Sequence, residues 1–258
     1  MTMKHLYILT GASRGMGLAM ARQLLAPQHL LLCISRQVSE ALQQEAKERE
    51  CRLIQWSQDL ADTGAASARL EQWLDELDTA DLSAATLINN AGVIPAIGPI
   101  DHCPPEQLSM ALRVGLEAPM LLTAGFLRAT GRWLGSGWQG PRKVLNISSG
   151  LGRHPMAAQA PYCAAKAGLD HFTRCSALDE QHRPGGARLV SLAPGVIDTD
   201  MQVQLRGGDP ALFPDRQRFL DLQSQGALSS AQSAAARVLA WLDRPDFGAQ
   251  PVADVRDN

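Results

Sequence analysis

Short apolar runs alternate with longer amphipathic stretches along nearly the whole chain. Apolar runs of roughly four to eight residues are typical of strands that are buried on both faces. The stretches between them have the spacing of helices with one apolar face. Because strands that alternate with helices form parallel sheets with helices on both faces, the pattern predicts an α/β fold. A chain of 258 residues is compatible with one domain of this class.

The alternation also predicts where the elements lie. The expected strands are Leu6–Thr10, Leu30–Ile34, Arg52–Trp56, Ala85–Asn89, Lys143–Ser148, Arg188–Ala193 and Pro251–Val255. The expected helices are Gly17–Leu25, Glu40–Glu50, Ala65–Leu77, Glu106–Arg132, Tyr162–His182 and Ala231–Leu242. The glycine-rich stretch Gly131–Arg142 is expected to be a loop. The segment Asp198–Ser230 interrupts the alternation after the sixth strand, so we expect an irregular lid over a ligand crevice.

Composition and charge exclude several classes of protein. The chain has 24 basic and 26 acidic residues, well mixed, so we expect no nucleic-acid and no membrane partner. The five cysteines lack a C-x-x-C pair and the six histidines lack metal-ligand spacing, which predicts a reducing compartment and no bound metal. No apolar run approaches the length of a membrane span, and the first residues lead directly into a strand. We therefore expect a cytoplasmic protein without a signal peptide.

A glycine-rich turn joins the first expected strand to the first expected helix. Gly11, Gly15 and Gly17 have the spacing G-x-x-x-G-x-G, and the residues between them include Ser13, Arg14 and Met16. Such a turn lets the backbone approach a pyrophosphate at the N-terminus of the helix. A lone glycine cluster can also form a plain tight turn, but its place between a strand and a helix predicts nucleotide binding.

The end of the second expected strand indicates which nucleotide is bound. Leu32–Arg36 contains no acidic residue to accept a hydrogen bond from a ribose 2′-hydroxyl. Arg36 instead offers a guanidinium to a 2′-phosphate, and Arg14 can reach the same group. The cofactor is therefore expected to be NADPH/NADP. Residues after the third and fourth strands are expected beside the adenine and along the cofactor: Asp59, Leu60, Asn89, Asn90, Ala91 and Gly92.

Tyr162 and Lys166, with Ser149 upstream, predict acid–base chemistry. Four residues separate the phenol from the ammonium, so both lie on one face of a helix. The positive charge favours the phenolate and is expected to lower the pKa of Tyr162 from its ordinary value of about 10. If the Ser149 hydroxyl donated a hydrogen bond to the same oxygen atom that exchanges a proton with Tyr162, it would polarise a carbonyl group. Taken alone, Tyr-x-x-x-Lys also occurs by chance on many surface helices.

Together, these elements resemble the short-chain dehydrogenase/reductase family over essentially the whole chain. The matching elements occur in the family's order: Thr10–Gly17, Asp59, Asn89–Gly92, Ser149, Tyr162 with Lys166, and Pro194–Thr199. The resemblance implies a Rossmann-like, doubly wound parallel sheet of seven strands in a single domain, residues 1–258, with the lid, residues 198–230, inserted within it. It implies that Tyr162 is the acid/base, that Ser149 orients the substrate carbonyl, and that Lys166 lowers the tyrosine pKa and binds the nicotinamide ribose. Thr199 and the backbone of Val196 and Ile197 would hold the carboxamide.

Within that family, the C-terminal part is similar to sepiapterin reductases and bacterial benzil reductases. The residues that carry this similarity are Asp198–Gln202, Arg216–Leu222 and Ala253–Asp257. In sepiapterin reductases an aspartate near the C-terminus anchors the pterin, and Asp254 matches it by position. A solvated carboxylate at the end of a strand is the alternative interpretation of Asp254. The other expected pocket residues are mostly apolar: Leu151, His154, Pro155, Gln159, Met201 and the lid, residues 198–230.

Gly115 departs from the family pattern. Family members usually carry an asparagine at this place, where it helps to hold a water that relays protons to the lysine. Glycine supplies no side-chain donor or acceptor, and it is costly inside a helix. The relay would then run through backbone carbonyls and water, or the proton supply would be slow.

The sequence therefore predicts an NADPH-dependent carbonyl reductase that transfers hydride to a ketone, diketone or aldehyde, with Tyr162 as the proton donor. Two alternatives stay open: an NADP-dependent alcohol dehydrogenase that works oxidatively, and an NADP-sensing protein with weak or no catalysis. The intact set of Ser149, Tyr162 and Lys166 argues against sensing, and Gly115 argues faintly for it. Family members usually pair through the helices that correspond to Glu106–Arg132 and Tyr162–His182, so we expect a homodimer or homotetramer.

Overall fold

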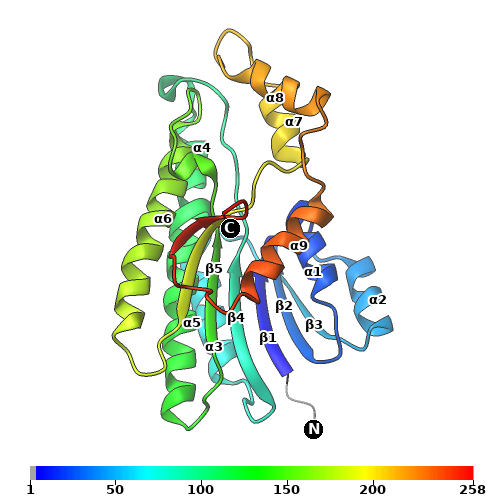
Figure 1. Ribbon diagram of the computed structural model, residues 1–258, viewed down its shortest axis with the longest axis vertical. Helices are drawn as coiled ribbons and strands as arrows, with labels where there is room; N and C mark the ends of the chain where they lie inside the picture. Colours follow the sequence, from blue (N-terminus) through cyan, green and yellow to red (C-terminus); the bar gives the residue numbers. More distant parts are fainter. Residues whose placement is uncertain (1–3, 258) are drawn as a thin grey trace.

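The computed structural model describes residues 4–257; residues 1–3 and 258 of the expected domain lie outside the described part. Its strands form one parallel sheet in the order β3-β2-β1-β4-β5-β6-β7 (Figure 1). The strands are β1 (Lys4–Thr10), β2 (His29–Ser35), β3 (Arg52–Ser57), β4 (Leu82–Asn89), β5 (Arg142–Ile147), β6 (Arg188–Ala193) and β7 (Val252–Asp254). The seven-stranded, doubly wound parallel sheet confirms the expected fold class.

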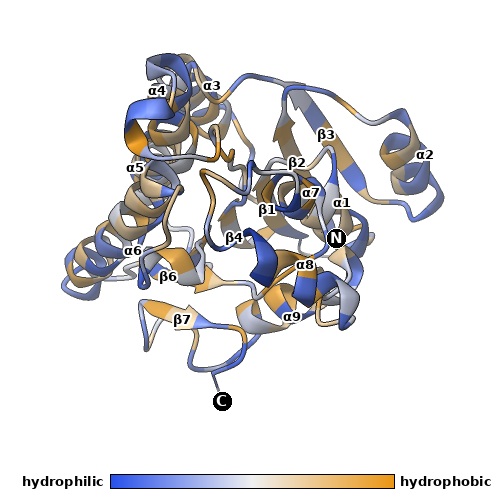
Figure 2. Ribbon diagram, turned by 90° about the horizontal axis from the view of Figure 1, so that it is seen from above, coloured by the Kyte–Doolittle hydropathy of each residue, from blue (hydrophilic) through white to orange (hydrophobic). Residues whose placement is uncertain are grey.

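Helices cover both faces of the sheet (Figures 1 and 2). The helices α1, α2 and α9 lie on one face, and α3, α5 and α6 lie on the other. The helices are α1 (Gly15–Gln23), α2 (Glu40–Glu48), α3 (Thr63–Asp75), α4 (Pro105–Leu112), α5 (Ala118–Gly135), α6 (Ala160–Gln181), α7 (Asp200–Arg206), α8 (Arg216–Ser224) and α9 (Ala231–Leu242). Shorter helical turns are η1 (Ile100–His102), the π turn η2 (Arg113–Glu117) and η3 (Gly150–Gly152).

Residues that alternate along each strand fill two separate cores. In β1, Leu6 and Ile8 are buried under α3 and α5, whereas Tyr7 and Leu9 are buried under α1 and α9. Burying one such side chain contributes roughly 1.5–3 kcal/mol to folding. Because both faces of the strands are apolar, both must be covered, and this requirement produces the three-layer arrangement.

The order of the strands creates a crevice at one end of the sheet. The strands β2 and β3 lie on one side of β1, and β4 to β7 lie on the other. The chain therefore runs from β1 toward one edge of the sheet and from β4 toward the other edge. In an open parallel sheet, this reversal creates a crevice at the carboxyl ends of the two strands. The turn that follows Thr10 and the segment that follows Asn89 both begin there.

The helix expected at Glu106–Arg132 differs from the structure at both its middle and its end. It is divided into α4, the π turn η2 and α5, and Gly115 lies in the π turn. The expected loop at Gly131–Arg142 is wrong in its first part, because α5 continues to Gly135. Contacts with α3 hold this last turn: Trp133 Nε1 donates to the carbonyl of Leu74 at 3.2 Å, and Arg132 pairs with Asp75 at 2.7 Å.

The segment Asp198–Ser230 is more regular than expected, because it contains α7 and α8. Leu205, Phe213 and Phe219 form a small apolar cluster, in which the two phenyl rings stack with centroids 5.7 Å apart. Ile94 and Ile97, from the segment after β4, pack against the same cluster. The two helices stand beyond the carboxyl ends of the strands, at the top of Figure 1. This is the position expected of a lid, and closure over a ligand stays a prediction.

One helical stretch, Pro105–Gly135, is long and apolar enough to cross a membrane by length and composition, which the sequence analysis did not anticipate. Half of its most apolar window is buried inside the protein. Arg128 and Arg132 on its outer side pair with Glu71 of α3. Its apolar residues, among them Leu122 and Phe126, belong to the core beneath the sheet. The apolarity of this stretch is therefore explained by its packing in the α/β fold.

The burial of His5 should make stability depend on pH. The ring stacks on Tyr7, with centroids 3.9 Å apart, and shares a 2.8 Å hydrogen bond with Thr86 Oγ1. Burial, and then the charges of His29 and Lys143, lower the pKa of His5 from about 6.5 to about 4. Below pH 6.5 the unfolded chain therefore takes up a proton that the folded chain does not, and stability falls as the pH falls toward 4.

We expect His5→Gln to remove this part of the pH dependence, which amounts to about 2 kcal/mol between pH 7 and pH 5. Urea unfolding at the two pH values measures it. The exposed His171→Gln is the matched control and should keep the wild-type slope. A slope unchanged by His5→Gln would contradict the assignment.

Candidate active site

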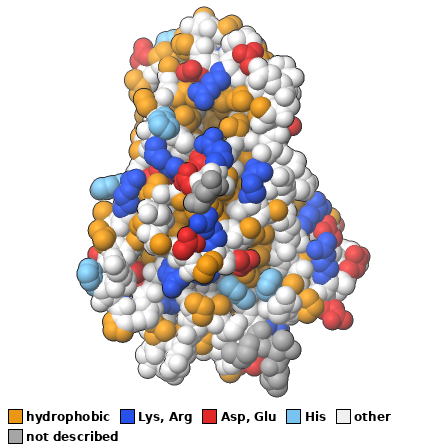
Figure 3. All heavy atoms as spheres, in the orientation of Figure 1, with side chains coloured by type: hydrophobic (Ala, Val, Ile, Leu, Met, Phe, Trp, Pro, Cys, Tyr) orange, Lys and Arg blue, Asp and Glu red, His pale blue; other side chains and the backbone are white. Residues whose placement is uncertain are grey.

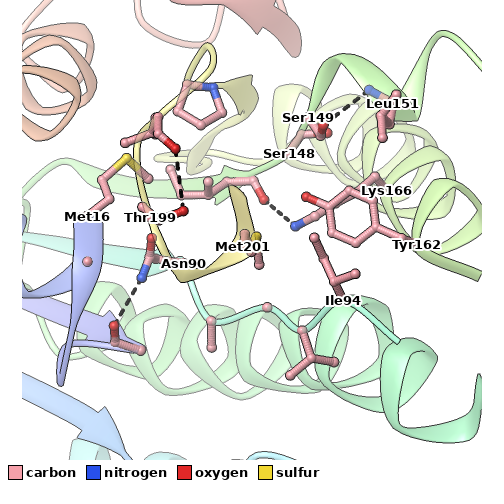
Figure 4. A pocket seen from close by; sticks show the side chains of 18 of the residues that line it. Met16, Asn90, Ile94, Ser148, Ser149, Leu151, Tyr162, Lys166, Thr199 and Met201 are labelled. Carbon is pink, nitrogen blue, oxygen red and sulfur yellow. Dashed lines mark hydrogen bonds between the residues drawn. The ribbon is translucent and has the colours of Figure 1, made fainter. Parts of the chain in front are cut away.

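A cavity of about 790 Å³ lies at the carboxyl ends of the strands. The residues proposed for cofactor, substrate or catalysis line it, from the glycine turn through Arg36, Asp59 and Leu60 to Met201 and Asp254. The exception is Asn89, which is buried and donates to Thr123 and Asn146 instead. Figure 4 shows Met16, Asn90 and Thr199 toward one end, and Ser149, Tyr162 and Lys166 toward the other. The fold thus brings together residues from all parts of the chain, and their individual roles stay predictions.

The glycine turn is held close against the segment after β4. Gly11 has φ +71°, and a Cβ on it would lie 2.9 Å from Ala91 Cα. A Cβ on Gly17 would lie 2.0 Å from the carbonyl oxygen of Gly11. Asn90 holds the two segments together, because its side-chain amide donates to the carbonyls of Thr10 and Gly11 at 3.0 and 3.2 Å. Only glycine fits at these positions.

The start of α1 is suited to an anion. Arg14, which precedes the helix, gives no side-chain cap, so the first N–H groups of α1 are not satisfied by its side chain. Such N–H groups and the helix dipole favour a phosphate. With the crowded turn beside it, this end of the cavity fits the pyrophosphate of a dinucleotide.

The two arginines expected at a 2′-phosphate, Arg14 and Arg36, both line the cavity. Arg14 donates to Asp200, the first residue of α7, at 2.8 Å, and both side chains are more than two-thirds exposed. Because an exposed ion pair contributes little, at most about 1 kcal/mol, Arg14 can exchange Asp200 for another anion.

Ser149, Tyr162 and Lys166 come from two neighbouring elements, the end of β5 and the first turns of α6 (Figure 4). Lys166 is only 4 % exposed, and its ammonium donates to the carbonyl of Ile147 at 2.7 Å. It lies 5.7 Å from the centre of the Tyr162 ring. The Ser149 hydroxyl accepts a 3.1 Å hydrogen bond from the N–H of Leu151, which orients it at the start of η3.

Burial sets the pKa values of Tyr162 and Lys166. It raises the pKa of Tyr162 to about 12, and a hydrogen bond from Ser149 acts in the opposite direction. It lowers the pKa of Lys166 to about 8, and the charge of Asp170 opposes this shift. The expectation of a lowered tyrosine pKa is therefore wrong for this structure, because removing the phenolate from water outweighs the opposing hydrogen bond from Ser149.

The π turn explains why a glycine stands at position 115. A Cβ on Gly115 would lie 3.1 Å from the Cβ of Ala165, the residue before Lys166. A larger side chain would therefore push the π turn away from α6. The close contact therefore favours a residue without a Cβ here, although glycine is ordinarily costly inside a helix.

The other end of the cavity is mostly apolar but carries Asp254, which was expected there, and Arg256, which the sequence did not single out. The carboxylate of Asp254 receives two hydrogen bonds from the Arg256 guanidinium, at 2.7 and 2.6 Å, and this pairing lowers the pKa of Asp254. Figure 3 shows charged side chains gathered around the C-terminal end of the chain. The lid expected to line the pocket contributes Gln202, Leu205, Arg218, Phe219 and Leu222. Further lining residues that were not predicted are Ile94, Met110, Val114 and Met156. Only the proximity of Arg256 to Asp254 in the sequence could have suggested the pair.

A doubly wound parallel sheet with a glycine-rich helix N-terminus at its switch point is the architecture of dinucleotide-binding proteins. Similarity to known proteins identifies the family within this class of dinucleotide-binding proteins. The chain belongs to the short-chain dehydrogenase family, whose model matches residues 5–209. It is therefore an oxidoreductase of a family that uses nicotinamide cofactors.

Two curated relatives and one solved structure illustrate the similarity. A benzil reductase ((S)-benzoin forming) from Bacillus cereus is 33% identical over 93% of this chain and 94% of its own length. A sepiapterin reductase from Meriones unguiculatus is 32% identical over 97% and 96%. A short-chain dehydrogenase/reductase from Burkholderia vietnamiensis is 31% identical, with a TM-score of 0.66 over 100% of this chain and 99% of that one. The resemblance to these groups noted in the sequence is confirmed.

The crowding at Gly17 predicts that Gly17→Ala displaces the glycine turn, because the clash is with backbone. We expect a loss of about 1–3 kcal/mol in stability and at least a tenfold (~1.4 kcal/mol) weaker binding of a nicotinamide cofactor. Urea unfolding and titration of reduced-cofactor fluorescence measure the two effects.

Gly131→Ala is the matched control. A Cβ there meets nothing within 4 Å, and the position is helical, so this variant should be as stable as the wild type or slightly more so. Equal cofactor affinity in Gly17→Ala and Gly131→Ala would show that the turn is not the cofactor site.

Proposed function

We propose that the protein is an NADPH-dependent carbonyl reductase that acts on a ketone, diketone or aldehyde of the benzil or sepiapterin kind. The observation that carries the proposal is the placement of Ser149, Tyr162 and Lys166 in one cavity with the glycine turn. The similarity to reductases named for benzil and sepiapterin supports the reaction class.

The residues of the cavity fit a dinucleotide. The glycine turn and the start of α1 would hold the pyrophosphate, Asp59 and Leu60 the adenine, and Asn90, Ala91 and Gly92 the middle of the cofactor. Thr199, Val196 and Ile197 would hold the carboxamide, and Lys166 the ribose next to it. Arg36 and Arg14 would bind a 2′-phosphate, which favours NADPH over NADH. When bound, NADPH supplies the hydride.

Tyr162 is suited to give a proton rather than to take one. With its pKa raised to about 12, the phenol is protonated at neutral pH and can donate to the oxygen of a carbonyl substrate. Ser149 would donate a hydrogen bond to the same oxygen and polarise the carbonyl. Lys166, cationic below pH 8, stabilises the phenolate that is left behind. This arrangement favours reduction over the oxidative alternative, which needs a phenolate base.

The substrate end of the cavity favours a flat or aromatic carbonyl compound. Leu151, Met201, Ile94 and Phe219 supply apolar surface. Asp254 is already paired with Arg256, so the two would act together on a polar group of the substrate rather than Asp254 alone. His154 lines the same region.

Self-association also stays a proposal. Met110 of α4, Met120 of α5 and Leu178 of α6 are exposed on the helices through which we expect a homodimer or homotetramer to form. A cytoplasmic location is likewise proposed from the composition.

Tyr162→Phe tests the reaction. It removes the proton donor and leaves the ring in place, so we expect NADPH oxidation with a diketone such as benzil to fall by about 10²–10⁴-fold. Absorbance of NADPH measures turnover, and fluorescence titration should show that the variant still binds the cofactor. Unchanged turnover would remove the tyrosine from the mechanism.

Arg36→Ala tests the cofactor preference. Losing a charge-assisted contact of about 1.5–3 kcal/mol should raise the KM for NADPH by roughly 10–100-fold and leave the KM for NADH nearly unchanged. The exposed Arg174→Ala on α6 is the control and should alter neither constant. If the wild type and Arg36→Ala use both cofactors equally well, the NADPH assignment is wrong.

A further inference from the structure

Asp170 is a buried carboxylate that the proposed reaction does not use. It lies on α6 one turn beyond Lys166 and is 1 % exposed. Its Oδ1 accepts a 2.6 Å hydrogen bond from the hydroxyl of Ser191 in β6. Its Oδ2 accepts a 3.2 Å hydrogen bond from Nε of Arg153. A buried carboxylate is stable only when its partners compensate for the lost water, so these contacts fix its place.

Arg153 connects Asp170 to the turn that carries Ser149. It follows η3, which begins directly after Ser149. Its Nη2 also donates to the carbonyl of Ala253 in β7 at 3.1 Å. The ion pair therefore fastens the Ser149 turn and the last strand to the helix that carries Tyr162 and Lys166.

The turn lies so close to α6 that only glycine fits between them. A Cβ on Gly152 would lie 2.9 Å from Oδ2 of Asp170 and 2.9 Å from the carbonyl oxygen of Lys166. The distance between Ser149 and the Tyr162 helix is thus set by a direct contact at Asp170. A displacement of this carboxylate would therefore shift the turn that carries Ser149.

The charges around Lys166 give Asp170 a second effect. Tyr162 and Asp170 lie beside it on α6, the carbonyl of Ile147 faces it from β5, and Arg113 and Glu117 of the π turn are exposed. Among the described residues, Asp170 is the charged group that raises the pKa of Lys166, against the effect of burial. Arg153 partly neutralises that carboxylate.

We propose that Asp170 and Arg153 form a positioning pair for the proposed active site. The pair holds the Ser149 turn against the Tyr162 helix, and its two opposite charges set the electrostatic environment of Lys166. This inference rests on the proposed carbonyl reductase function. It assigns a role to two residues that need not touch substrate or cofactor.

The pH dependence of kcat for NADPH oxidation with a diketone tests the pair. Activity should decline above pH 8 as Lys166 loses its proton. Asp170→Asn removes the negative charge, so this alkaline limb should move to lower pH, by about one unit. Arg153→Gln leaves Asp170 uncompensated, so the limb should move to higher pH. A purely structural role would not produce shifts in opposite directions.

Ser191→Ala is the matched control, because it removes the shortest hydrogen bond of Asp170 and keeps both charges. It should leave the alkaline limb at the wild-type pH, whatever its effect on stability. Arg153 is partly exposed, so Arg153→Gln keeps the test available if Asp170→Asn does not fold.

The experiment distinguishes failure of the positioning pair from failure of the proposed function. If the wild type turns over the diketone but the limb does not move, or moves in the same direction in Asp170→Asn and Arg153→Gln, the positioning pair is overturned and the proposed function stands. If the wild type oxidises NADPH with no ketone, diketone or aldehyde at any pH, the proposed function itself is overturned, and the inference falls with it.

Discussion

Two backbone segments approach each other closely at the carboxyl ends of β1 and β4, and this contact positions the cavity and the start of α1 beside it. The turn after Thr10 lies against Asn90 and Ala91, and there is no room for a Cβ at Gly11 or Gly17. Asn90 closes the contact with hydrogen bonds to two carbonyls of the turn. This contact fixes the start of α1 beside the switch point of the sheet, where a phosphate can be held by backbone N–H groups.

A second constraint is the burial of a phenol and an ammonium side by side. In water the two groups would titrate at about 10 and about 10.4, whereas here burial moves the two pKa values apart, to about 12 and about 8. The cation therefore does not by itself make the tyrosine more acidic. What it provides is a positive charge that meets the phenolate only when one forms, and this suits a proton donor.

Glycines also decide how closely the surrounding helices approach this pair. Gly115 lets the π turn contact Ala165, and Gly152 lets the Ser149 turn contact Asp170. Both contacts are made to α6, within four residues of Lys166. The helix that carries the proposed acid is therefore confined from two sides by backbone, so its side chains have a fixed place above the end of β5. An asparagine at position 115 would bring its Cβ to 3.1 Å from the Cβ of Ala165, so the π turn or α6 would have to shift by a few tenths of an ångström.

The parallel sheet could be predicted from the sequence because its strands are apolar on both faces, so both faces must be covered. The glycine turn could be predicted because its residues are adjacent in the chain. The sequence also identified Ser149, Tyr162 and Lys166, which the fold places in one cavity. The π turn, the continuation of α5 to Gly135, the helices of the lid and the partners of Asp170 were visible only in the folded chain. These features depend on contacts between distant segments, such as Trp133 with Leu74 and Arg153 with Asp170, which no local pattern records. The direction in which the pKa of Tyr162 shifts also depends on the tertiary structure, because it depends on how much water the folded chain removes from the phenol.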